Sequence, residues 1–164
     1  MSILKWAVLA VVMIAVAGDV FTRKTFHVET VIAAPPEKAW AVLMDTSAYP
    51  EWNPVFVSVD GKYTKGAQLL NKVKDPSGKI LEMTATVTEV TTNKMLRQRG
   101  GIWGVITFDH QWILEPVPGG TKVIQHEVDR GLFLWFWDSS WIEPSYARTN
   151  EALKKRVMDR SAQQ

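Results

Sequence analysis

The sequence predicts an α+β fold in which a curved antiparallel sheet wraps around a long C-terminal helix. From Val55 to Arg130, short runs of alternating apolar and polar residues are separated by glycine- and proline-rich breaks, as in consecutive strands. One strand-like run and one helix-like run precede this region, and a long helical pattern follows it from Ile142 onward. A sheet with one apolar face needs another element to cover it, so we expect the sheet and the last helix to pack together.

Length and composition place the chain among ordinary globular domains. Its 164 residues fit one domain with a sizeable core, and the 46% hydrophobic and 22% charged residues argue against disorder. The net charge is +2 and the basic residues are scattered, so no nucleic-acid partner is expected. The chain has no cysteine, which excludes disulfides, thiol nucleophiles and cysteine metal sites.

Residues 1–24 are expected to be a targeting or anchor segment, followed by the domain at 25–164. Twelve consecutive apolar residues begin at Trp6, closer to a secretory h-region than to a full span of about 20 residues. Ala15 and Ala17 supply an A-x-A-like cleavage site; an uncleaved segment with Lys5 at the interface would be a short anchor. We expect an exported or membrane-anchored protein of the bacterial periplasm or inner-membrane type, with a soluble mature domain. The alternative is a buried first helix.

The first elements of the domain are a strand and a helix. The strand at 26–34 ends at a Pro-Pro pair, and the next residues begin a helix, with Pro36 and Glu37 suited to its first turn. One face of that helix is apolar, formed by Ala39, Trp40, Val42, Leu43 and Met44. The stretch 46–54 holds two prolines and is expected to be a short turn or a broken helix.

Six strands are expected next, at 55–60, 67–74, 79–90, 94–99, 105–115 and 121–130. The expected breaks fall at Asp60-Gly61, 76–78, Gly100-Gly101 and 116–120. Within the run at 79–90, Leu81, Met83, Ala85 and Val87 share one face and polar residues share the other. That alternation is typical of a sheet covered on one side, and an inward-facing Met83 would give a soft, adaptable wall.

The chain ends with an aromatic row and a helix. Six large apolar residues, Leu132–Trp137, stand in an unbroken row that fits neither the strand period nor the helix period. Pro144 suits the first turn of the last helix. The residues Tyr146, Asn150, Leu153 and Val157 lie along one stripe of that helix.

Few polar residues are candidates for a cavity in this sheet. On strand 105–115, His110 shares its face with Phe108, Trp112 and Leu114. The alternation on strand 121–130 leaves two registers open, since a slip of one residue exchanges the two faces. One register places His110 opposite His126. The other places His110 near Glu127, with Gln125 beside Trp112.

Four segments in this order resemble the polyketide cyclase/dehydrase branch of the SRPBCC (START-like) superfamily: APPEKAW with YPEWNP, FDHQWILEPVPGGT, EVDRGL, and NEALKKRV. The resemblance runs from about His27 to Val157. It implies the helix-grip fold, in which about six to seven strands wrap around the C-terminal helix and two short helices follow the first strand. It also implies a deep, mostly apolar cavity for lipids, sterols or polyketides, although only some members are enzymes.

The resemblance also favours the register that brings His110 near Glu127. It implies that Trp52 borders the cavity and that residues 131–141 lie at the cavity mouth, where the aromatic row would act as a lid. Trp103 is expected to cap the cavity or the core. The expected ligand-binding residues are Trp52, Asn53, Met83, Trp103, Phe108, His110, Trp112, Gln125, Glu127, Phe133 and Trp137.

The expected function is non-catalytic binding of a hydrophobic small molecule or lipid. The alternatives are a polyketide cyclase or dehydratase with His110 and Glu127 as an acid–base pair, and an assembly factor that uses the aromatic stretch. No cofactor is expected, and no metal, since His110 and His126 lack a third ligand. A membrane is the second expected partner, through the N-terminal segment and through Trp135 and Trp137 at the interface.

Overall fold

The structure is a computed structural model that describes residues 3–163, without the side chains of Ala15 and of residues 19–21. The expected targeting segment therefore lies partly outside the described residues, at residues 1 and 2, at the Ala15 side chain of the expected cleavage site and at the three side chains that follow Gly18.

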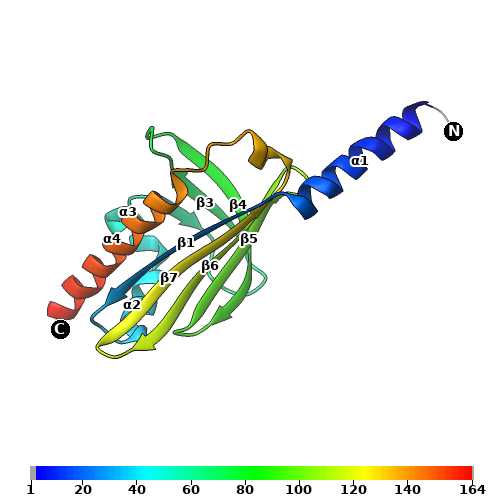
Figure 1. The fold of residues 1–164 in the computed structure, drawn as a ribbon. Coiled ribbons are helices and arrows are strands. Elements are labelled where there is room, and N and C mark those ends of the chain that lie inside the picture. Colours follow the sequence, from blue (N-terminus) through cyan, green and yellow to red (C-terminus); the bar gives the residue numbers. More distant parts are fainter. Residues whose placement is uncertain (1–2, 164) are drawn as a thin grey trace.

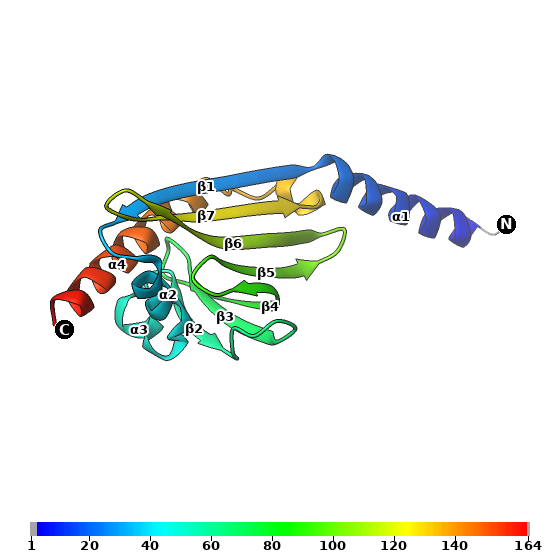
Figure 2. The ribbon, with the colours of Figure 1, turned by 90° about the horizontal axis from the view of Figure 1, so that it is seen from below.

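One antiparallel sheet of seven strands forms the domain, in the order β1-β7-β6-β5-β4-β3-β2 (Figure 2). The sheet curls around α4 (Ile142–Ala162), so the expected α+β helix-grip fold is confirmed. The strands are β1 (Arg23–Ile32), β2 (Phe56–Asp60), β3 (Gln68–Lys74), β4 (Ile80–Thr91), β5 (Met95–Ile102), β6 (Ile106–Val117) and β7 (Gly120–Arg130).

Short helices join the two edge strands. They are α2 (Pro36–Met44), the 3-10 helix η1 (Thr46–Ala48) and α3 (Tyr49–Trp52), so the broken helix expected after the first helix is confirmed. Pro36 lies in the first turn of α2, where its missing N–H is not needed. The apolar face of α2 is buried against the core through Ala39, Trp40, Val42 and Leu43.

The strand β5 runs through its two glycines, so the break expected at Gly100-Gly101 is wrong. The turn instead comprises residues 103–105. A Cβ at Gly100 would collide with the carbonyl oxygen of Thr84 and the ring of Phe108, and Gly101 has a φ of 98°. These glycines therefore permit a close approach between strands rather than ending one.

The side chains of the aromatic row, Leu132–Trp137, point in different directions. It begins with the 3-10 helix η2 (Leu132–Trp135), which follows Gly131 at a φ of 128°. Leu134 is buried, whereas Trp135 and Phe136 are exposed. Trp137 turns the other way, with its ring stacked on Phe133 at 6.4 Å and edge-on to Trp141 at 6.1 Å.

The helix α4 crosses the concave face of the sheet. The stripe expected from the sequence is confirmed, because Tyr146, Asn150, Leu153 and Val157 are all buried. Ion pairs at the far end join α4 to the short helices: Arg160 contacts Asp45 at 2.9 Å, and Arg156 contacts Glu51. These contacts hold the C-terminal part of α4 against the short helices.

The helix α1 (Ile3–Phe21) projects away from the domain at the end where β1 begins (Figure 1). The large apolar side chains described between Ile3 and Val16 are exposed, from 89% at Ile3 to 38% at Val16, so these residues do not form a buried helix. At Gly18 the helix approaches η2 so closely that a Cβ would collide with the side chain of Leu132. Among residues 3–163, no helix is both long and apolar enough to cross a membrane.

Candidate functional site

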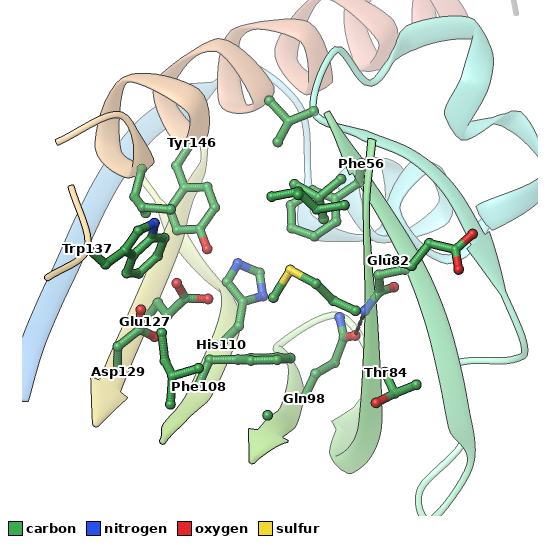
Figure 3. Close-up of a pocket in the computed structure, with 18 of the residues that line it drawn as sticks. Phe56, Glu82, Thr84, Gln98, Phe108, His110, Glu127, Asp129, Trp137 and Tyr146 are labelled. Carbon is green, nitrogen blue, oxygen red and sulfur yellow. Dashed lines mark hydrogen bonds between the residues drawn. The ribbon is translucent and has the colours of Figure 1, made fainter. Parts of the chain in front are cut away.

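A cavity of about 350 Å³ lies between the concave face of the sheet and the N-terminal part of α4 (Figure 3). This volume is in the range of about 300–1,000 Å³ that small-molecule sites occupy. Most of the wall is apolar and comes from five strands and the segment before α4. Its apolar residues include Val55, Phe56, Val73, Leu81, Met83, Ile102, Ile106, Phe108, Trp137, Trp141 and Ile142.

The pairing of β6 with β7 brings the polar residues to one end of this cavity. His110 lies opposite Glu127, and Trp112 lies opposite Gln125. This is the second of the two registers left open by the alternation of β7, and it is confirmed.

The buried side-chain amide of Gln125 orients His110. Its Nε2 lies 3.2 Å from Oε1 of Gln125, whose Nε2 donates to the Tyr146 carbonyl oxygen at 3.1 Å and to Oδ1 of Asn150 at 2.8 Å. The Gln125 amide nitrogen is thus committed, so its oxygen accepts and Nε2–H of His110 donates. Burial lowers the pKa of His110 to about 4. The imidazole is therefore neutral at pH 7, with its Nδ1 lone pair not used by Gln125.

A pair of carboxyl groups lies beside His110. Glu127 and Asp129 are two residues apart on β7, so both side chains lie on the cavity face, and both are buried. Burial raises the pKa of each group, and repulsion from Asp129 raises that of Glu127 further. Both groups therefore keep their protons to a higher pH than ordinary carboxyl groups, and Asp129 is the first of the two to ionise as the pH rises through neutrality.

Tyr146 completes this polar end from α4. Its hydroxyl points toward Glu127 (Figure 3), and its ring lies 5.2 Å from that of His110. The Asp129 Oδ1 atom has no hydrogen-bond partner among the described residues. The polar end therefore combines a neutral imidazole, a phenol and a buried carboxyl pair.

Five of the predicted site residues line the cavity: Met83, Phe108, His110, Glu127 and Trp137. His110 and Glu127, the predicted acid–base pair, lie opposite each other but have different hydrogen-bond partners. His110 bonds Gln125, whereas Glu127 interacts with Asp129 and Tyr146. Asp129 and Tyr146 were not among the predicted site residues, although the spacing of Glu127 and Asp129 on one strand indicates a shared face.

The other predicted residues lie outside the wall. Trp52 packs edge-on against Tyr49, and Asn53 accepts hydrogen bonds from the backbone N–H groups of Val55 and Phe56. Trp103 is 59% exposed on the turn between β5 and β6 and does not cap the cavity.

Three predicted residues support the wall from behind or beside it. Trp112 is buried in the main core, edge-on to His110. Gln125 is buried behind His110, and Phe133 is half-exposed against Trp137. Within residues 3–163, no group of three or more His, Asp or Glu side chains is arranged to hold a metal ion.

A curled antiparallel sheet that grips a C-terminal helix around an apolar cavity defines a helix-grip, ligand-binding domain. Residues 23–158 match the family described as polyketide cyclase / dehydrase and lipid transport, and the chain belongs to that family. No curated protein matches the chain in sequence.

Solved structures share the fold at low sequence identity. The Zhui aromatase/cyclase from a Streptomyces species is 14% identical with a TM-score of 0.69, over 85% of this chain and 96% of that one. An uncharacterized protein from Rhizobium leguminosarum is 16% identical with a TM-score of 0.67, over 84% and 96% of the two chains. The di-domain ARO/CYC StfQ of the steffimycin biosynthetic pathway is 9% identical with a TM-score of 0.70, over 85% of this chain and 52% of that one.

Proposed function

We propose that the protein binds a hydrophobic small molecule or lipid in the cavity between the sheet and α4. The observation that carries this proposal is the cavity itself, about 350 Å³ with a mostly apolar wall and one polar end. The apolar wall would remove the body of a ligand from water, and the few polar groups would fix its orientation. The family, described by both cyclisation and lipid transport, supports this class of ligand.

Filling the cavity tests the proposal. Met83 lies in the wall, so a Met83→Trp substitution places a larger side chain where the ligand would lie. We expect this variant to lose binding of a neutral, apolar fluorescent probe that the unmodified protein binds.

A second candidate is an acid–base enzyme of the cyclase or dehydratase type. It is favoured by the proximity of a neutral imidazole and a protonated carboxyl group in one apolar cavity, where each could move a proton at a ligand. In this candidate His110 is the base and Glu127 the acid. His110→Ala should then abolish turnover of a polyketide substrate by the folded protein, and unchanged turnover would remove His110 from the mechanism.

We further propose that the end of the molecule that carries α1 associates with a membrane, with α1 as a targeting or anchor segment. Exposed apolar side chains gather there from α1, from the β5–β6 turn and from η2. Besides those of α1, they are Ile102, Trp103, Val105, Phe133, Trp135 and Phe136. The backbone N–H of Phe133 donates to the Val105 carbonyl oxygen at 3.0 Å, so these segments are adjacent.

Basic residues beside this apolar end support the same proposal. Arg23, Arg97, Arg99 and Arg130 line a groove with Trp103, where the one acidic residue of the lining, Asp109, pairs with Arg97 and Arg99. Trp side chains favour the membrane interface, and arginines favour the anionic headgroups next to it. An exported or inner-membrane location follows from this proposal.

A further inference from the structure

The charged residues that line the cavity are all acidic: Glu82, Glu127 and Asp129, without a lysine or arginine. Glu82 is at the rim, with a 59% exposed side chain that contacts Lys72 at 3.3 Å. Glu127 and Asp129 are the buried acidic residues of the lining. We propose that the cavity selects apolar molecules that carry a protonated amine and rejects apolar carboxylates. This inference rests on the proposed ligand-binding function and specifies the class of ligand.

The carboxyl pair has no direct cationic partner in the described residues. Lys24 of β1 is near enough for its charge to lower the pKa of Asp129. Its ammonium group donates instead to the Trp137 carbonyl oxygen at 3.2 Å and to Oγ of Ser139 at 2.9 Å. Asp129 is only 2% exposed, and its Oδ1 accepts no hydrogen bond. A buried carboxylate in that position is stabilised by any donor or cation that a ligand brings.

A second unpaired acceptor lies on the wall formed by β3 and β5. Asn71 is 3% exposed, and its Nδ2 donates to Oε1 of Gln98 at 3.2 Å. Its Oδ1 has no hydrogen-bond partner among the described residues. Two walls of the cavity therefore present acceptors without donors, which independently favours a ligand that donates hydrogen bonds.

Aromatic rings surround the carboxyl pair. Figure 3 shows Trp137 and Tyr146 on one side of Glu127 and Asp129, with Phe108 nearby on the other. The faces of such rings attract a cation, and this attraction is larger where water is excluded. A charged amine placed between the rings and the carboxyl pair would meet both stabilising interactions, whereas a carboxylate would meet repulsion from both.

Other charged groups near the pair do not reverse this preference. The charged ones are Lys24 from β1 and Asp109 from β6, and Tyr146 from α4 is a neutral phenol because burial raises its pKa. Asp109 is held outside the cavity by Arg97 and Arg99 at 2.6 and 2.7 Å. His110 is neutral at pH 7 because burial lowers its pKa. Acidification should protonate the carboxyl pair completely and remove the negative charge that attracts an amine.

Three ligands of equal chain length test the inference in the full chain: decylamine, 1-decanol and decanoate. Each is titrated at pH 7.5 against a neutral fluorescent probe held in the cavity. We expect decylamine to bind at least about tenfold more tightly than decanoate, with decanol between them. The double substitution Glu127→Gln and Asp129→Asn, or a shift to pH 5, should bring the amine and the carboxylate within about threefold of each other. Glu115→Gln removes a half-exposed carboxylate of β6 that pairs with Lys122 and does not line the cavity, so it is the matched control and should retain the full preference.

Each outcome of this titration has a distinct meaning. Equal binding of the three ligands, or tightest binding of decanoate, overturns the amine inference and leaves the ligand-binding function standing. Retained amine preference in the double variant, with circular dichroism showing a native fold, also overturns it. Failure of the probe and of all three ligands to bind the unmodified protein contradicts the proposed function itself.

Discussion

The carboxyl pair Glu127–Asp129 is expected to make the stability of the domain depend on pH. Burial raises the pKa of Glu127 to about 8 and that of Asp129 to about 7, so the folded state binds more protons than the unfolded chain above the ordinary carboxyl range. The stabilisation is complete below an ordinary carboxyl pKa and is lost as the pH rises through 7 and 8. The free energy of unfolding should therefore fall between pH 6.5 and 9, by an amount on the order of 2 kcal/mol.

Urea denaturation at several pH values measures this effect. The double variant Glu127→Gln and Asp129→Asn should show a much flatter profile over the same range, because it lacks both titrating groups. Glu82→Gln, a carboxyl group at the exposed rim, should follow the unmodified protein. Parallel profiles for all three proteins would show that the pair is not protonated as described.

For individual residues, the sequence predicted which face of a strand a side chain occupies, but it did not predict the hydrogen-bond partner of that side chain. Alternation along 105–115 was enough to place His110 on an apolar face, and the family pattern selected the register that pairs it with Glu127. The partner of His110 is Gln125, because Gln125 is oriented by Tyr146 and Asn150 of α4. That orientation depends on how the last helix crosses the sheet, which no local pattern of residues encodes.

The element that connects β7 to α4 gives the clearest test of membrane association. Trp135 and Phe136 are 66% and 82% exposed beside α1, whereas Trp137 turns into the cavity. Replacing Trp135 and Phe136 by serine should lower the binding of the full chain to anionic vesicles at least about fivefold, since each apolar side chain gains roughly 1.5–3 kcal/mol on full burial.

Vesicle co-sedimentation measures this binding. Val31→Ser is the matched control, since Val31 is 49% exposed on the same sheet but at the opposite end of β1 from α1. Equal loss of binding in both variants, or no loss in the serine double variant, would remove η2 from the proposed contact. The sequence predicted Trp135 and Trp137 for this contact. A row with no period does not reveal which of its members turns inward.

Local signals also misled the assignment of one strand. The pair Gly100-Gly101 was predicted to be a break between strands. Instead β5 continues to Ile102, because those glycines let Thr84 and Phe108 approach the backbone. A close approach in space and a turn in sequence both favour glycine, so composition alone cannot separate them. The other strands end within two residues of their expected bounds, apart from β1, which begins three residues earlier than expected at Arg23.

The architecture of the whole molecule was the most predictable level. Three signals agree: the alternation of apolar and polar residues in the strands, the turn residues between them, and the buried stripe of the last helix. Together they predict a sheet that wraps around a helix, as the structure shows. The cavity was expected from the family resemblance and not from the periodicity. Its dimensions and its acidic end depend on the curl of the sheet, which brings residues of β3, β5, β7 and α4 to one space.

A matched pair of tryptophan substitutions shows whether this space holds an apolar ligand. Met83→Trp fills the cavity wall, whereas Met158→Trp places the same side chain on an exposed part of α4. Each purified full chain is titrated with N-phenyl-1-naphthylamine, and circular dichroism confirms that each is folded. We expect a loss of probe affinity of at least about tenfold in Met83→Trp and none in Met158→Trp. Equal probe binding by both folded variants, or none by the unmodified protein, would contradict it.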